Sequence, residues 1–234
     1  MMKMRIRFIL FYGLCLVACG ASAQEAAQLV QKVRDKLAKV DNYRAEALMS
    51  TDIPFLKIPS SRVTVYFKHP DRFRIQQQGG ISITPKGGMD INLNALFATK
   101  NYTVLDAGTA MYNNKKLHVV KLLPLDENSR MVISTLYIDA GEMLIHRAET
   151  TSKDNGTFQI EMSYGKYAGW GLPDKVTFLF NTREYKLPKG IAFDYETNAA
   201  KSKGEGAPRD KGSVRLEYSS YSINRGVPDS VFTR

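Results

Sequence analysis

The sequence contains few of the residues that most often carry chemistry. Its 234 residues include two cysteines, three histidines and one tryptophan. Both cysteines, Cys15 and Cys19, lie in the first twenty residues, so a chain that loses this segment has no thiol nucleophile and no redox pair. The sequence also lacks a serine-elbow motif, a phosphate-binding glycine loop and an HExxH zinc motif. We therefore expect a protein without catalytic activity.

The histidines and acidic residues give little support for a metal or hydrolytic site. His69, His118 and His146 are far apart in the sequence, and each is alone in an expected strand or turn. No pair of carboxylates stands out from the polar positions, so a general acid and base cannot be assigned. We expect no metal ligands and no cofactor, although ligands brought together across strands, or a hydrolase triad without a sequence motif, are alternatives.

Long hydrophobic runs are also absent beyond the start of the chain. Residues 1–23 begin with the basic residues Lys3, Arg5 and Arg7, and continue with an apolar run over residues 8–17. This run is too short to span a bilayer. Residues 1–23 are therefore interpreted as a signal peptide, and the chain is expected to leave the cytoplasm.

Two cleavage patterns overlap at the end of this segment. Residues 16–20 resemble a bacterial lipobox, in which Cys19 would be acylated and anchored to a membrane. Residues 21–23 read Ala-Ser-Ala, which suits ordinary signal peptidase. Because a helical pattern begins almost at once, we favour cleavage after Ala23 and a soluble protein, with lipidation of Cys19 as the alternative.

The net charge is strongly positive. With 33 Lys and Arg against 23 Asp and Glu the formal charge is +10, and loss of residues 1–23 with their three basic residues leaves +7. Such a charge often indicates nucleic-acid binding. Export and the scattered positions of the cations argue against it here, and favour a solvated surface, an anionic membrane or an acidic partner. The densest basic stretch, residues 201–211, is rich in Gly and mixes both signs, so we predict a mobile insertion near residues 196–212.

Hydrophobic periodicity predicts one helix followed by a sheet. Apolar residues recur at helical spacing from Leu29 to Val40. Period-two alternation then marks strands over residues 61–68 and 156–164 and around Phe178 and Leu216. Turn-forming residues separate these strands. A second, short helix is predicted over residues 89–98. The fold class is therefore mainly β (α+β), with a single curved antiparallel sheet forming an incomplete barrel, an N-terminal helix and a short helical lid.

Several short motifs, taken in order, resemble the LolA/LolB family of periplasmic lipoprotein carriers and outer-membrane receptors. After the amphipathic helix, residues 66–75 read YFKHPDRFRI, a strand that runs into a basic-Pro turn. Residues 119–124 end in an apolar-Pro signature, residues 136–144 resemble the family's next hairpin, and residues 227–232 read VPDSVF. The likeness spans nearly all of residues 24–234.

The resemblance implies a non-catalytic periplasmic carrier that shelters lipid or lipoprotein acyl chains in a half-barrel, for outer-membrane lipoprotein sorting. We expect a monomer, with an inner- or outer-membrane protein as partner and no nucleic acid. A regulatory sensor of the same superfold, bound to a membrane-anchored partner, is the alternative. Apolar alternation by itself equally predicts an ordinary packed core. The expected acyl-chain contacts are Val65, Phe67, Phe73, Ile75, Phe158, Ile160 and Met162, with Leu93 and Phe97 from the lid.

One position departs from the family pattern. The carriers have an arginine before the turn proline, which latches the lid by hydrogen bonds, and this sequence has His69 there. A neutral imidazole has one donor where a guanidinium has five. The resemblance therefore predicts a weaker lid latch at His69, and the alternative is that His69 only begins the turn at Pro70.

Overall fold

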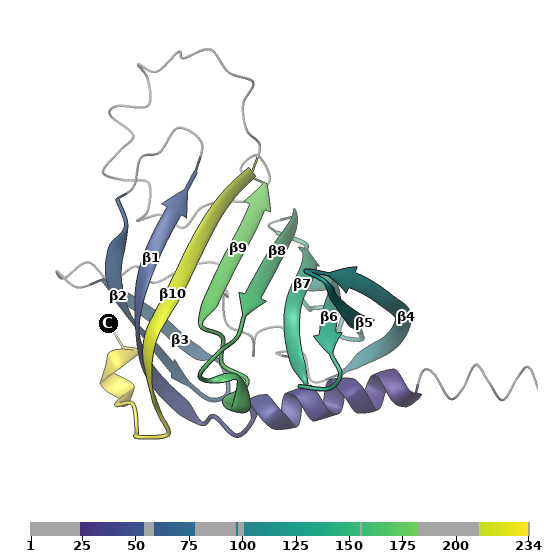
Figure 1. The fold of residues 1–234 in the computed structure, drawn as a ribbon, viewed down its shortest axis with the longest axis horizontal. Helices are drawn as coiled ribbons and strands as arrows, with labels where there is room; N and C mark the ends of the chain where they lie inside the picture. Colours follow the sequence, from purple (N-terminus) through teal and green to yellow (C-terminus); the bar gives the residue numbers. More distant parts are fainter. Residues whose placement is uncertain are drawn as a thin grey trace, which may run out of the picture.

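The protein folds around one antiparallel sheet of ten strands that does not close on itself (Figure 1). The strand order is β3-β2-β1-β10-β9-β8-β7-β6-β5-β4, and within the described residues the edge strands β3 and β4 do not pair with each other. The sequence-based expectation of a mainly β, incomplete barrel is thus confirmed. The computed structural model describes residues 24–53, 59–77, 97, 101–154, 156–181 and 211–233.

All neighbouring strands run antiparallel, so the sheet consists of two meanders joined where β1 pairs with β10. Among the residues described, no helix is long and apolar enough to cross a membrane. The strands are β1 (Asn42–Asp52), β2 (Ser61–Lys68), β3 (Arg72–Gln77), β4 (Tyr102–Tyr112), β5 (Lys115–Pro124), β6 (Met131–Asp139), β7 (Leu144–Ser152), β8 (Gly156–Ser163), β9 (Lys175–Asn181) and β10 (Lys211–Ile223).

The predicted N-terminal helix is confirmed over residues 24–37. It lies across one end of the curved sheet (Figure 1). Its apolar residues recur every three or four positions, which places them on one face of the helix. That face is buried in the main core through Ala26, Leu29, Val30, Val33 and Leu37.

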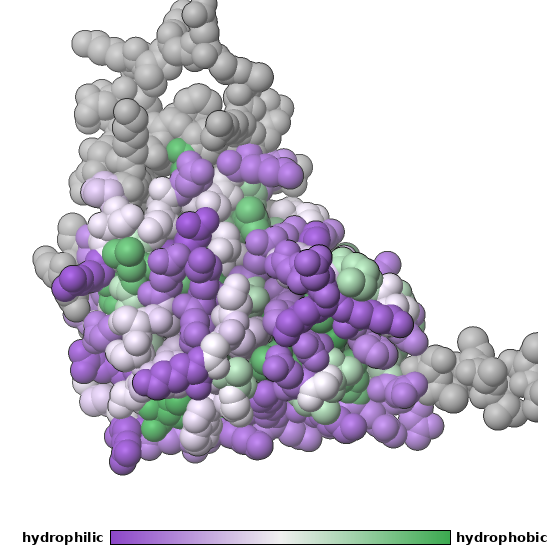
Figure 2. Space-filling model, viewed as in Figure 1, coloured by the Kyte–Doolittle hydropathy of each residue, from purple (hydrophilic) through white to green (hydrophobic). Residues whose placement is uncertain are grey.

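The strands bury one face and leave the other largely hydrated. On β2, Val63, Val65 and Phe67 are all fully buried and belong to the same core as the helix. We call this inner side of the sheet the concave face and its opposite the convex face. The surface in view over β1, β10, β9 and β8 is mostly hydrophilic, with scattered hydrophobic side chains (Figure 2).

Turns form where the sequence predicts them. Asn113 and Asn114 join β4 to β5 with φ angles of 48° and 62°. Two successive positive φ angles are typical of a type I′ hairpin turn, whose twist matches that of the flanking strands. His69 and Pro70 lie between β2 and β3, and the peptide bond between them is cis.

Two short 3₁₀ helices support the ends of the sheet. The helix η2 (Ala168–Trp170) ends at Gly171, whose φ of 71° suits glycine. The helix η4 (Asp229–Val231) follows β10, and the Asp229 carboxylate accepts hydrogen bonds from Lys68 Nζ at 2.7 Å and Arg72 Nη1 at 2.5 Å. These contacts hold the chain after β10 against β2 and β3.

Three expectations fall wholly or partly outside the described residues. They are the signal peptide at residues 1–23, the second helix at residues 89–98 and the insertion at residues 196–212. Of the second helix only Phe97 is described, and it is buried in the core. The last two residues of the expected insertion already belong to β10.

Candidate ligand-binding site

Seven of the nine residues expected to contact acyl chains lie on three strands. Val65, Phe67, Ile75, Ile160 and Met162 are buried with exposed fractions of 3% or less. Phe73 and Phe158 are only partly buried and pack against this core, so they offer the most accessible aromatic surface. Phe97 is buried with 9% exposure, and Leu93 lies outside the described residues.

The structure brings these residues together in two groups. On β2 and β3, Val65 pairs with Ile75 and Phe67 pairs with Phe73. The second group is on β8, where Phe158, Ile160 and Met162 follow each other at every second position. Strands β1, β10 and β9 separate the groups. Both groups belong to the one core of the concave face.

A cross-strand row of side chains runs along the concave face and includes the expected residue Ile160. The pairings that define it connect seven strands from β4 to β10. Every apolar member of the row is buried. The row consists of Asp106, Val120, Leu136, Ala148, Ile160, Phe178 and Val214. Only its first position, on the edge strand β4, carries a charge.

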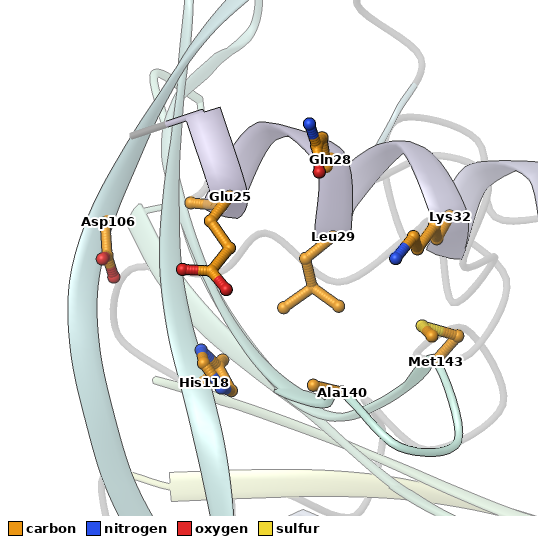
Figure 3. Close-up of a pocket in the computed structure, with 9 residues that line it drawn as sticks. Glu25, Gln28, Leu29, Lys32, Asp106, His118, Ala140 and Met143 are labelled. Atoms are coloured by element: carbon orange, nitrogen blue, oxygen red, sulfur yellow. The ribbon is translucent and has the colours of Figure 1, made fainter. Parts of the chain in front are cut away.

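A pocket of about 210 Å³ lies at this charged end, between the N-terminal helix and strands β4 and β5. Leu29 from the helix reaches towards Ala140 and Met143 in the turn after β6 (Figure 3). In the same view the Glu25 carboxylate points towards His118 on β5. The pocket therefore has an apolar side next to the core and a polar side next to solvent.

The polar side of the pocket carries charges of both signs. Glu25 and Lys32 come from the helix and Asp106 from β4, with the imidazole of His118 beside them. Sequence reasoning missed this group, because its members come from three separate elements. One sequence signal could have revealed this charged group. On β4 the alternation of apolar and polar residues breaks at Asp106, where an acidic residue occupies a position that faces inward.

Aromatic rings fill the concave face elsewhere. The Tyr221 ring lies 5.3 Å from that of Tyr43, and 4.9 Å from those of Tyr167 and Tyr218. The Tyr221 hydroxyl donates to the Pro173 carbonyl at 2.7 Å. Burial raises the pKa of Tyr218 and of Tyr221 well above the usual value, so neither hydroxyl ionises near neutral pH. This cluster packs the sheet and offers no acid or base for catalysis.

His69, the expected latch residue, is exposed at the turn between β2 and β3. Its backbone N–H donates to the Asp41 carbonyl at 2.7 Å. In the part of the chain that the structure describes, its side chain makes no hydrogen bond. A latch to residues 89–98 stays a prediction, because of these only Phe97 is described.

Three metal-ligating side chains meet on the hairpin of β6 and β7, where the sequence indicated isolated histidines. One ligand atom each from Asp139, Glu142 and His146 lies within 4.8 Å of the others. Lys115 on β5 lies beside them, with its Nζ 3.4 Å from Asp139 Oδ2. Burial lowers the pKa of His146, and the charge of Lys115 acts in the same direction, so the imidazole is neutral at pH 7.

Similarity to known proteins lies in the fold. No family profile and no curated protein matches the sequence. The crystal structure of a DUF1329 family protein from Desulfovibrio piger superposes with a TM-score of 0.55 and 12% identity, covering 92% of this chain and 97% of that one. A LolA superfamily protein from Nitrosomonas europaea gives 0.54 and 13%, covering 87% and 97%.

A domain from Vibrio parahaemolyticus, named for outer membrane lipoprotein sorting, gives a TM-score of 0.53 with 10% identity. It covers 90% of this chain and 97% of the other. The chain has a LolA-like fold. This fold agrees with the resemblance that the sequence motifs indicated.

Proposed function

We propose that this protein is a non-catalytic periplasmic carrier that binds acyl chains of lipid or lipoprotein on its concave face, for outer-membrane lipoprotein sorting. The observation that carries the proposal is the apolar row across the sheet, which ends at a pocket with a charged side. An acyl chain has the same division, with a long apolar part and one polar end. The LolA-like fold supports the same assignment.

The energetics of burial suit such cargo. Each methylene removed from water contributes about 0.8 kcal/mol, so an exposed acyl chain is costly to solvate. Typical small-ligand pockets have volumes of about 300–1,000 Å³. The pocket beside Glu25 has about 210 Å³, which suits one end of a lipid rather than the whole molecule. The remaining methylenes would lie along the concave face.

The N-terminal helix and the cargo would compete for this surface. The helix buries Leu29 and Val33 in the same core as Ile160 and Phe178. The helix also donates hydrogen bonds to the rest of the protein. Lys36 Nζ donates to the Glu142 carbonyl at 2.7 Å, and Arg34 Nη1 donates to the Tyr102 hydroxyl at 3.1 Å. When no cargo is bound, the helix covers this face. Cargo must displace those contacts, which lowers the net free energy of binding and keeps release possible.

Binding of a fluorescent fatty acid to the mature protein tests the proposal. We expect saturable binding to the wild type, and a loss of at least about tenfold in Phe158→Glu, because a charge on the concave face opposes an apolar ligand. Thr157→Glu is the matched control, because Thr157 is the exposed preceding residue on the same strand. It should bind as the wild type does.

Both variants must unfold cooperatively, which shows that they are folded and that a lower affinity reflects the binding face. Mass spectrometry of lipid extracted from protein purified from its own periplasm then identifies the cargo. Absence of saturable binding to folded wild type would contradict the proposal, and so would an equal loss in the two variants.

A further inference from the structure

The hairpin of β6 and β7 contains a β-bulge that changes the direction of one side chain. Pairing between the two strands jumps from Tyr137 with Arg147 to Ile138 with Ile145, which leaves His146 without a partner residue. Ile138 and Ile145 face the core. In a regular strand each residue faces opposite to its neighbours, and a bulge interrupts that alternation. At this bulge His146 lies beside Asp139, and its ring is 5.5 Å from that of Tyr164, which packs against the core.

The turn of the hairpin fixes the first carboxylate. Asp139 Oδ1 accepts hydrogen bonds from the backbone N–H groups of Gly141 and Glu142, at 3.0 and 3.1 Å. Its other oxygen, Oδ2, faces His146 Nε2 at 3.9 Å. Glu142 carries a more exposed carboxylate in the same turn. One rigid and one adjustable carboxylate thus stand beside one imidazole.

The His146 ring presents an available nitrogen to this cluster. Its Nε2 is buried and has no hydrogen-bond partner among the described residues. The same atom lies 3.9 Å from Asp139 Oδ2. The ring packs edge-on against that of Tyr164, with the centroids 5.5 Å apart, so Nε2 is held beside the carboxylate.

A cation already occupies the edge of this cluster. Lys115 Nζ lies 3.4 Å from Asp139 Oδ2 and 3.7 Å from Glu142 Oε2, both longer than a close charge-assisted hydrogen bond. The Lys115 side chain is 49% exposed, so it can move away. The two carboxylates thus attract positive charge, and the ammonium does not use the nitrogen of His146.

We propose that Asp139, Glu142 and His146 form a binding site for a divalent transition-metal ion, with Zn²⁺ as the best match. A nitrogen ligand with two carboxylates suits zinc better than magnesium or calcium, which prefer oxygen alone. Ligands at zinc distances of about 2.0–2.1 Å lie about 3.3 Å apart in a tetrahedron, so small side-chain movements complete the site. Water would supply the fourth ligand.

The site has a direct link to the N-terminal helix. Glu142 supplies a ligand oxygen from its side chain, and its carbonyl accepts the hydrogen bond from Lys36. A bound ion fixes the turn that holds this part of the helix. None of the three proposed ligands is among the residues that line the pocket, so zinc binding and acyl-chain binding can be measured separately.

Calorimetric titration of the chelator-treated mature protein with Zn²⁺ tests the site. We expect one ion to bind per chain, and Co²⁺ to give the intense visible absorption of a four-coordinate ion. His146→Gln and Asp139→Asn should each weaken binding about 100-fold. The amide introduced by Asp139→Asn keeps an oxygen acceptor for the turn and lacks the anionic Oδ2, so the hairpin is expected to fold.

Two further variants separate the site from weak surface binding. Lys115→Gln should strengthen Zn²⁺ binding about tenfold, because it removes the competing cation. His118→Gln, which removes an exposed histidine on β5, should leave Zn²⁺ affinity unchanged. The proposal is overturned if the wild type shows no saturable 1:1 binding, or if His118→Gln and His146→Gln lose affinity equally. Urea unfolding of each variant shows that the proteins compared are folded.

Discussion

The two faces of the sheet carry the same interaction in two environments. On β7, Thr150 faces inward and its hydroxyl lies 2.8 Å from that of buried Ser134. Its neighbour Thr151 faces outward, and its hydroxyl lies 2.9 Å from that of exposed Thr157. The geometry is nearly equal, but only the inner pair has no water to replace a lost partner. Environment rather than distance therefore decides what each pair contributes.

The same contrast applies to the larger side chains. The concave face packs the rings of Phe158, Phe178 and Phe180 against one another. The convex face carries exposed ion pairs such as Arg44 with Glu46, which typically contribute little because water and salt screen them. The face that we propose binds cargo is thus also the face that holds the protein together. Changes made there must be checked for stability before they are read as binding effects.

The largest effect is expected from Phe178→Ala on the concave face. Phe178 is fully buried, and its loss leaves a cavity beside Phe158 and Phe180. We expect the free energy of unfolding to fall by about 3–5 kcal/mol, measured by urea unfolding. Thr177→Ala, at the next position on the convex face, is the control and should cost much less. Equal costs would remove the distinction between the faces.

A smaller effect is expected from Ser134→Ala, which sharpens the comparison at the hydroxyl pair. The change leaves the buried Thr150 hydroxyl without its partner, and should cost about 1–3 kcal/mol in unfolding free energy. The double variant Ser134→Ala/Thr150→Val removes both polar groups and should recover most of that loss. If the double variant lowers the unfolding free energy by the sum of the two single losses, the hydrogen bond between Ser134 and Thr150 does not cause the loss in Ser134→Ala.

Asp229→Asn tests an exposed charge cluster through its pH dependence. The hydrogen bond and charge of Lys68, with a contribution from Arg72, lower the pKa of Asp229. A carboxyl with a lowered folded-state pKa stabilises above its unfolded value of about 4 and loses this contribution as pH falls through the folded value. We expect the variant to have a slightly smaller unfolding free energy than wild type at pH 7. This difference should disappear as the pH falls and Asp229 of the wild type becomes protonated. A gap that stays constant down to a pH of about 2 would contradict this assignment.

The smallest effect is expected from Thr151→Val on the convex face. Water can satisfy the Thr157 hydroxyl when its partner is lost, so the unfolding free energy should change by no more than about 0.5 kcal/mol. Thermal unfolding of the single variants Thr151→Val and Ser134→Ala, each compared with wild type, measures the two losses of stability. A cost as large as that of Ser134→Ala would show that exposure does not separate the two pairs.

The regular strands and the fold class could be predicted from the sequence because alternation records which side chains face the core. Val65 and Phe67 on β2, and Ile160 and Met162 on β8, follow this pattern and are buried as expected. The pairing of β1 with β10 could not be read this way, since period-two patterning shows a face but not a neighbour.

The candidate sites were harder to predict for two physical reasons. The pocket combines Glu25, Asp106 and His118, which come from different elements and meet only after the sheet curls. The group of Asp139, Glu142 and His146 depends on a bulge at His146, and one extra residue in a ladder leaves no clear mark in composition or spacing.

The pairing of β1 with β10 has a consequence for the order of folding. Tyr43 near the start of the sheet pairs with Ile223 near its end, whereas the strands from β4 to β9 pair only with neighbours in sequence. Local pairings form quickly, and distant ones must first close a long loop. We expect the β4–β9 meander to form early and the β1–β10 seam to close last. Until then β1 and β9 each have an unpaired edge, so a newly exported chain is most exposed to aggregation before its final strand is in place.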